Sequence, residues 1–384
     1  MGRRRATPAR APGGSTERLH VPELDWLMLS VVALCCLGLV MSVSIVGAHD
    51  QKTTTLAVMK AQGSKLLVGL VAFLCCALIP IGLVRRLGLP LFAVGTAACA
   101  ATRFLFPPVH HAYRWIVLGG HSFQPVELAR FALVIATADL LARAGRGITT
   151  FGRGFLPVMG CAVLLAASLL VQPDHGNAIL VICLASCTAL IAGVRFLHFV
   201  PLAVAGIGLV MARASSHSYV MDRLAGFLSV KPGSQVGQGL VALASGGAFG
   251  RGLGQGWMKM GFVPEARNDF VFAIVGEELG YAGSLLVLLL FTTIGFVGYR
   301  LVLSMRDPFL RLLVCGFTLL ICMQAAVNLM VVSGWAPAKG IDLPFVSTGG
   351  SSLVFFLAAT GLIGNAARTD FTSGRSVPSN PGRV

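Results

Sequence analysis

The sequence predicts an all-α polytopic membrane protein with about ten transmembrane helices. Of its 384 residues, 55% are hydrophobic and 12% are charged, whereas a soluble domain usually carries about 25% charged residues. The mean hydropathy is +0.81. Several apolar runs also reach the roughly 20 residues that a helix needs to cross the hydrocarbon core of a bilayer. A soluble protein with a large core does not fit this composition.

The expected spans follow one another through short connectors, except between the seventh and the eighth. They cover residues 26–48, 65–84, 87–106, 126–144, 154–171, 176–194, 197–213, 270–299, 310–333 and 349–367. The connection at 214–269 is long, glycine-rich and polar, and loops of this length are usually functional or disordered. We therefore expect one membrane domain over residues 26–368, with this long loop outside, and polar, disordered tails at 1–25 and 369–384.

The placement of arginine predicts that both termini are cytoplasmic. The tail before the first span is rich in arginine, as is typical of a cytoplasmic segment, and it has no cleavable signal pattern. The first span would then act as a signal anchor in the cytoplasmic (inner) membrane. The net charge of +15 comes largely from arginines in connectors. No aromatic-basic patch or nucleic-acid motif accompanies it, so we expect no nucleic-acid partner.

Polar residues gather in the segments that this orientation places outside. The first of these segments contains Arg114-Trp115 and, further on, Gln124-Pro125-Val126-Glu127. An arginine beside a tryptophan can be a simple interface anchor. Glu127 and Arg130, however, are spaced i,i+3 near the start of a membrane helix, where charges are costly and usually paired. The alternative interpretation is a basic ligand clamp that a helix-end ion pair supports.

The next two outer motifs also have both a structural and a functional interpretation. In Gln172-Pro173-Asp174-His175-Gly176-Asn177, a tight turn joins two spans, and Asp174 either caps a helix or holds a neighbouring loop. The glycine-rich segment 245–254 allows positive φ and a close approach of the backbone to a ligand. With Arg251 and Lys259 it could hold a phosphate through backbone N–H groups and cations, although no Walker sequence follows it.

The last two motifs flank the eighth and tenth spans. Asp269 begins a long apolar helix, where it would be unremarkable as an N-cap. Glu277 and Glu278 lie ~12–14 Å deeper at 1.5 Å per residue, and acids at that depth need partners or a polar cavity. Residues 338–352 alternate apolar side chains with proline, glycine and serine, which predicts a re-entrant loop packed against protein.

Taken in this order, the motifs resemble the SEDS family (shape, elongation, division and sporulation), and within it the FtsW/RodA/SpoVE group, over residues 26–368. The resemblance rests on Arg114-Trp115 with Gln124-Pro125-x-Glu127, Gln172-Pro173-Asp174-x-Gly176, the glycines of 246–254, Pro264-Glu265 through Asp269-Phe270 to Glu277-Glu278-Leu279-Gly280, and Leu343-Pro344-Phe345 with Ser347-x-Gly349-Gly350-Ser351-Ser352. The segments 276–278 and 339–344 are more similar to the division-type members FtsW and SpoVE than to RodA.

The resemblance implies an inverting peptidoglycan glycosyltransferase that polymerises lipid II into glycan strands at the outer face of the membrane, in septal synthesis during cell division. Asp269 matches the acid regarded as catalytic in the family, and a divalent cation, Mg or Mn, is a further expectation at Asp269. The residues expected to bind substrate are Arg114, Trp115, Gln124, Arg223, Lys259, Lys339 and Ser347, and those expected to support them are Glu127, Asp174, Glu277 and Glu278. The implied partners are lipid II, the nascent glycan, a class B penicillin-binding protein (a transpeptidase) and other divisome proteins.

Some positions depart from the family pattern. Val126 stands where serine is usual, Arg267-Asn268 where His-Thr is usual, Thr348 where tyrosine is usual, and Arg130 where lysine is common. The acid itself is retained, so the activity is still implied.

Two other classes of function stay open at this point. A flippase for lipid II would need polar residues along a path through the membrane, often with inverted repeats. A non-catalytic scaffold that recruits the transpeptidase would tolerate the altered neighbours of Asp269. Few charges lie in the middle of the spans, and Asp139 can pair with Arg143 near the inner face. Because most polar groups gather outside, the sequence favours chemistry at the outer face.

Overall fold

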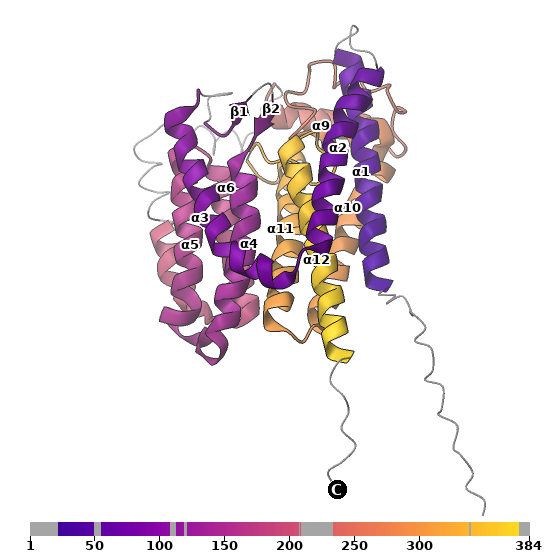
Figure 1. Ribbon diagram of the computed structural model, residues 1–384. Helices are drawn as coiled ribbons and strands as arrows, with labels where there is room; N and C mark the ends of the chain where they lie inside the picture. The colour runs from indigo at the N-terminus through magenta and orange to yellow at the C-terminus, as the bar shows by residue number, and fades with distance from the viewer. Residues whose placement is uncertain are drawn as a thin grey trace, which may run out of the picture.

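The computed structural model describes residues 22–49, 55–107, 113–118, 121–206, 208, 233–337 and 339–375, and within them the protein is a helical bundle (Figure 1). Eight of the helices described are long and apolar enough to cross a membrane. They are α1 (Pro22–His49), α2 (Thr55–Leu78), α3 (Ile81–Leu105), α5 (Leu156–Val171), α6 (His175–Ala192), α10 (Val271–Ser304), α11 (Pro308–Val332) and α12 (Gly350–Arg375). The predicted polytopic all-α fold is confirmed.

A further long helix, α4 (Pro125–Ala144), differs from these because it contains several charged residues. It packs against α3, α5, α6 and α11, and most of its side chains are buried. The 3₁₀ turn η1 (Gly145–Thr149) and the π-helical turn η2 (Phe151–Phe155) connect it to α5. Of the span expected at 197–213, the structure describes the turn η3 (Phe196–Phe199) and helix as far as residue 206; the rest lies outside the described residues.

The second and third spans begin earlier than the hydropathy pattern predicts. The prediction placed the connector at Arg85-Arg86, whereas the helices meet at Pro80, the residue before α3. Proline has no N–H and cannot continue the hydrogen bonds of the preceding helix. Arg85 instead lies within α3, where its Nε is 2.5 Å from Asp139 Oδ1. Asp139 also pairs with Arg143 at 2.6 Å, as the i,i+4 spacing predicted.

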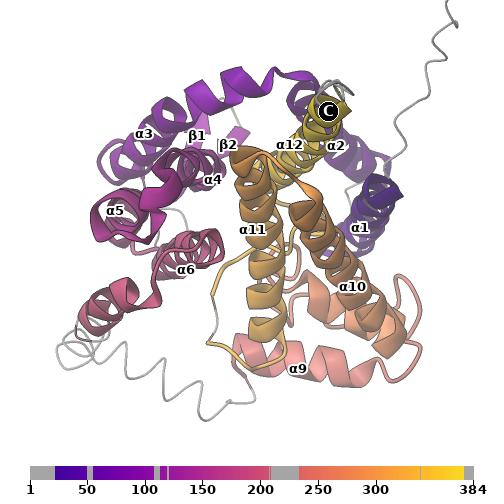
Figure 2. The same ribbon diagram turned by 90° about the horizontal axis from the view of Figure 1, so that it is seen from below.

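The helices divide into two groups with α11 between them (Figure 2). One group contains α3, α4, α5 and α6, and the other contains α1, α2, α10 and α12. The hairpin of β1 (Ile116–Leu118) and β2 (His121–Phe123) and the helix α9 (Gln235–Ser245) lie at one end of the bundle. α1 begins and α12 ends at the opposite end. α12 runs to Arg375, past the expected boundary at 368.

The glycine-rich segment after α9 packs against the backbone of α10. Gly280 interrupts the helical geometry of α10 with φ 69° and ψ −163°. At this kink the amide of Tyr281 donates to the carbonyl of Gly247 (2.9 Å), and the amide of Gly252 donates to the carbonyl of Glu278 (3.0 Å). An ideal Cβ on Gly280 would lie 2.2 Å from the amide nitrogen of Gly250. The glycines therefore allow the backbone to approach α10 closely, as predicted, but the neighbour is a helix and not a ligand. Several of the backbone N–H groups proposed to bind phosphate instead donate hydrogen bonds to α10.

Substitution of Gly280 should destabilise the protein. Gly280→Ala places a Cβ at positive φ and against the Gly250 amide, and strain of this kind costs about 1–3 kcal/mol. We expect a lower Tm in detergent. The matched control is Gly160→Ala in α5, where a Cβ meets nothing within 4 Å and alanine favours the helix by up to ~1 kcal/mol. Equal Tm values for the two variants would contradict the constraint.

Candidate active site

A cavity of about 1090 Å³ lies at the end of the bundle that carries β1 and β2. Its walls come from α2, α4, α6, α11, α12, the β hairpin, the segment before α10 and the loop before α12. The charged residues that line it are Lys65, Arg114, Glu127, Arg130, Glu265, Asp269 and Asp342. This concentration of charge in an otherwise apolar bundle marks the cavity as the candidate site.

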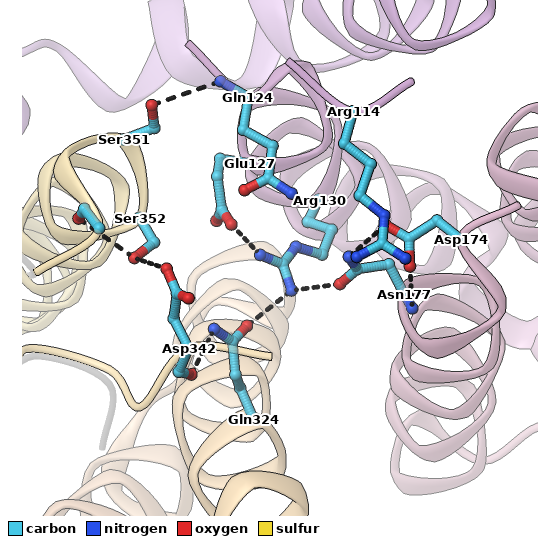
Figure 3. A network of polar contacts seen from close by, with 11 residues as sticks. Arg114, Gln124, Glu127, Arg130, Asp174, Asn177, Gln324, Asp342, Ser351 and Ser352 are labelled. Carbon is cyan, nitrogen blue, oxygen red and sulfur yellow. Dashed lines mark hydrogen bonds and ion pairs between the residues drawn. The ribbon is translucent and has the colours of Figure 1, made fainter. Parts of the chain in front are cut away.

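A buried arginine network forms the floor of the cavity (Figure 3). Arg130 is 2% exposed and forms the predicted ion pair with Glu127 on the same helix. Its guanidinium also donates to Asn177 Oδ1 (3.1 Å) and to Gln324 Oε1 (2.6 Å). These contacts join α4, α6 and α11. The planar guanidinium suits such a site, because it offers five donors in fixed directions.

Arg114 is held at the cavity wall by Asp174. Its Nε lies 3.2 Å from Asp174 Oδ2. Asp174 also caps α6 by accepting from the amide of Asn177 (3.2 Å), and it accepts from the Asn177 side chain (2.8 Å). The two interpretations offered for Asp174, a helix cap and a support for a neighbouring loop, are therefore both correct. Figure 3 shows Arg114 and Asp174 together at the edge of the network.

Asp269 lies on the cavity wall just before α10. Its side chain does not cap the helix, because Phe270 holds the N-cap position. Asn328 of α11 fixes the backbone there by donating to the carbonyls of Asp269 and Ile341, both at 2.7 Å. An ideal Cβ on Gly340 would lie 3.0 Å from Asp269 Oδ2 and 3.5 Å from Arg114 Nη1. The loop before α12 thus passes close to the acid and the arginine, and a side chain at position 340 would press on the Asp269 carboxyl.

Ser347 and Thr348 fasten the loop 339–349 to the segment that carries Asp269. Ser347 Oγ donates to the carbonyl of Asn268 (2.7 Å) and accepts from the amide of Leu343 (2.8 Å). Thr348 Oγ1 donates to Asn268 Oδ1 (2.7 Å). Ser347 is 5% exposed and does not line the cavity, so its place supports a role in holding the loop rather than in contacting substrate.

A second carboxyl group, Asp342, lies beside Asp269. Both carboxyls line the cavity, and the charge of Asp342 acts on Asp269. Ser352 Oγ donates to Asp342 Oδ2 (3.1 Å), and Gln324 Nε2 donates to the Asp342 carbonyl (3.0 Å). Burial, followed by the charges of Asp342 and Glu265, raises the pKa of Asp269 well above its ordinary value. Burial also raises the pKa of Asp342. A carboxylate with a raised pKa is a stronger base.

Asp342 and Lys65 line the cavity, although the sequence pattern predicts no specific role for either. An acid in an otherwise apolar loop already indicates a candidate functional residue at Asp342. Only the folded loop, however, brings Asp342 to Asp269. Lys65 was placed at the end of a span, whereas α2 begins at Thr55 and Lys65 lies ten residues further along. Lys65 Nζ donates to the carbonyl of Thr348 (2.9 Å), and the side chain lines the cavity.

Of the other residues predicted to bind substrate, some line the cavity and some do not. Trp115 and Gln124 line the cavity. Lys339 lies against the start of α6, where its Cδ is 3.3 Å from an ideal Cβ on Gly176, and it is not among the lining residues. Arg223 lies outside the described residues.

Lys259 forms a buried ion pair with Glu278, with Nζ and Oε1 2.5 Å apart and both side chains at most 1% exposed. Ser44 of α1 contacts both groups, at 2.7 Å from each. Glu277 accepts from the amide of Trp257 (2.8 Å). The expectation that these two deep acids find partners is correct. The position of Lys259 supports a structural role, since it fixes the long outer segment to α10 and α1.

These features define a class of polytopic membrane protein whose acid-lined cavity is built at one end of a helical bundle. The family described as "Cell cycle protein", FtsW/RodA/SpoVE, matches residues 25–371, and the chain belongs to this family.

Relatives and solved structures agree with that assignment. The chain is 36% identical to stage V sporulation protein E of Bacillus subtilis, over 66% of this chain and 71% of that protein. It is 33% identical to the probable peptidoglycan glycosyltransferase FtsW of Saccharophagus degradans, over 89% and 92%. A chain of a structure described as "structural coordination of polymerization and crosslinking by a peptidoglycan synthase complex" matches with TM-score 0.76 and 27% identity, over 90% of this chain and 97% of that one. The crystal structure of the rod shape determining protein RodA of Thermus thermophilus matches with TM-score 0.67 and 25% identity, over 90% and 96%.

Replacement of Arg130 should destabilise the folded protein, because Glu127 is then buried without its ion-pair partner. We expect Arg130→Met to lower the free energy of unfolding by about 3–5 kcal/mol and to lower Tm. The double variant Glu127→Gln, Arg130→Met should recover part of this loss, since no buried charge is then left alone. Arg86→Met in α3 is the control, because the Arg86 side chain is exposed. A double variant no more stable than Arg130→Met would contradict the pairing argument.

Proposed function

We propose that this protein is a peptidoglycan glycosyltransferase that polymerises lipid II. The observation that carries the proposal is Asp269, a carboxyl with a raised pKa on the wall of a cavity that also holds Lys65 and Arg114. Membership of the family supports it, because relatives over about nine-tenths of the chain are named as probable peptidoglycan glycosyltransferases. The arrangement contains a base and cations, which transfer of a glycosyl group from a diphosphate requires.

The reaction would join the 4-hydroxyl of a terminal GlcNAc to C1 of a MurNAc. As the new C1–O bond forms, the bond from C1 to the phosphate oxygen breaks, and undecaprenyl pyrophosphate leaves with that electron pair. The proton of the attacking hydroxyl passes to the Asp269 carboxylate. An α-linked donor that gives a β-linked glycan implies inversion, with attack in line with the leaving group. Arg114, held by Asp174, supplies positive charge beside the acid.

A divalent cation, Mg or Mn, is part of the proposal. Among the described residues, no group of three or more His, Cys, Asp or Glu side chains could hold a metal. Asp269 and Asp342 do offer two adjacent carboxyls. Magnesium is commonly bound through one or two carboxylates together with substrate phosphates, so the pair fits such an ion. The chemistry that it would supply when bound is neutralisation of charge on the diphosphate.

The partners and the location belong to the same proposal. A matching chain comes from a complex that coordinates polymerization and crosslinking, which supports a class B penicillin-binding protein as partner, with other divisome proteins beyond it. The names of the FtsW relatives support a place at the division septum. The end of the bundle where α1 begins and α12 ends would face the cytoplasm, and the cavity would then open outside.

Replacement of Asp269 should abolish polymer formation while the protein still inserts in the membrane. With lipid II, and with or without the partner transpeptidase, we expect a ladder of glycan products from the wild type and at least about a hundredfold less from Asp269→Ala, because the general base is gone. Glu23→Gln is the control, since Glu23 belongs to a surface ion pair with Arg300 (3.4 Å) at the opposite end of the bundle.

A ladder of normal strength from Asp269→Ala would refute the role of the acid. A wild type that makes no ladder under any partner or metal condition would favour the two other classes. Movement of labelled lipid II across liposomes that contain only this protein would then indicate a flippase. Full cellular function of Asp269→Ala would indicate a scaffold.

The raised pKa of Asp269 predicts the pH dependence of the reaction. The base acts only when it is deprotonated, so activity should fall on the acid side at a higher pH than for an ordinary carboxylate. Asp342→Asn removes a neighbouring negative charge, which lowers the pKa of Asp269, so the acid limb of kcat against pH should shift to lower pH. An unchanged acid limb would show that Asp342 does not influence the titration of the base.

A further inference from the structure

We propose that Lys65 binds the diphosphate of the donor substrate and holds it as the leaving group, an inference that rests on the proposed glycosyltransferase function. Lys65 is one of three described cations that line the cavity, the others being Arg114 and Arg130. It comes from α2, a helix that contributes no other charged residue to the cavity lining.

The three cations differ in what they contact. Arg130 is committed to Glu127 and to two side-chain amides, and Arg114 forms an ion pair with Asp174. Within the described part of the chain, the partner of the Lys65 ammonium is a backbone carbonyl, that of Thr348 at 2.9 Å, and no carboxylate lies within ion-pair distance. An ammonium has three donors. Lys65 therefore retains donors from which an incoming anion can accept hydrogen bonds.

A lysine at this position is costly unless it has a function. Lys65 lies in the part of α2 that is apolar enough to span a membrane, residues Leu56–Leu78. Charged side chains within such segments are expensive, and they usually mark a site for a substrate or an ion. The contact with Thr348 attaches α2 to the loop before α12, but an uncharged donor would serve that purpose at a lower cost in desolvation.

The surroundings of Lys65 also favour an anion. Its Cδ is 3.3 Å and its Cε 3.5 Å from an ideal Cβ on Gly350, so the side chain lies across the first residue of α12. The N–H groups of a first helical turn have no partner within the helix and carry partial positive charge. Thr348, Gly349, Gly350 and Ser351 all line the cavity there. Lys65 is the main observation behind the proposal, and the partial positive charge at the amino end of α12 adds to it.

The arrangement of the cavity fits attack in line with the leaving group. Asp269 lies before α10 and Lys65 on α2, and both line the cavity. A base and a leaving-group cation on separate walls can act on opposite faces of the reacting carbon, as inversion requires. Val68, one turn after Lys65, lines the same cavity and is 57% exposed. An apolar surface beside the cation suits a diphosphate that carries a lipid chain.

Direct binding tests the proposal without turnover. The affinity of the purified full chain for undecaprenyl diphosphate is measured in detergent for the wild type, Lys65→Met, Lys65→Arg and Lys60→Met. We expect Lys65→Met to raise Kd about tenfold or more, as loss of a charge-assisted contact does, and Lys65→Arg to restore most of the affinity. Lys60 is an exposed lysine of the same helix outside the cavity lining, so Lys60→Met should bind as the wild type does.

Inorganic pyrophosphate, used as a second probe, distinguishes the source of the phosphates. Binding that is lost in Lys65→Met would locate recognition in the diphosphate itself. An effect seen only with the undecaprenyl compound would support a lipid-borne diphosphate. Equal Kd values for wild type and Lys65→Met, or a change in Tm alone, would overturn the proposal and assign Lys65 to the attachment of α2.

The same variants separate this inference from the proposed function. In the polymerisation assay, Lys65→Met should raise KM for lipid II and should also lower kcat, because the departing diphosphate loses a cation, and Lys65→Arg should reverse both changes. A ladder that is lost in Asp269→Ala but has wild-type kinetics in Lys65→Met would keep the polymerase and reject Lys65. Because Kd is measured without turnover, an inactive wild type would still report whether Lys65 binds the diphosphate.

Discussion

The cavity depends on one buried cation, the guanidinium of Arg130. It is 2% exposed, and a charge in such a place is tolerated only when it is paired and hydrogen-bonded. Glu127, Asn177 and Gln324 satisfy that requirement from three helices. Because each partner must be in place at once, α4, α6 and α11 are fixed relative to one another at the floor of the cavity. Gln324 also fixes the loop before α12 to this network, since its side-chain amide donates to the carbonyl of Asp342.

Above this floor, the acid is placed by backbone rather than by its own side chain. Asn328 joins the carbonyls of Asp269 and Ile341, and Ser347 and Thr348 join the same loop to Asn268. Gly340 leaves room for the Asp269 carboxyl beside Arg114. Two carboxyls are thereby held together in a partly buried space, which accounts for the raised pKa of Asp269. The position of the base and its protonation equilibrium thus have a common structural cause.

The long outer segment is stabilised separately from the cavity. The glycines between residues 246 and 280 allow its backbone to pack against α10. The buried ion pair of Lys259 and Glu278 attaches it to α10 and, through Ser44, to α1. Glu277 accepts amide hydrogen bonds from the segment. Since α10 begins two residues after Asp269, these contacts support the helix that follows the acid without reaching the reacting groups.

By itself, the sequence determined the helical membrane fold, most of the spans, the ion pair of Glu127 with Arg130 and the candidate acid Asp269. These features are local: a span is a run of apolar residues long enough to cross the bilayer, and an i,i+3 pair meets on any helix. Only the tertiary structure placed Asp342 beside Asp269, moved Lys65 from a helix end to the cavity, and took Lys259 and Ser347 out of the lining. Each of these depends on contacts between segments far apart in the chain. No local pattern specifies which of several polar residues will face a cavity and which will be consumed in holding it together.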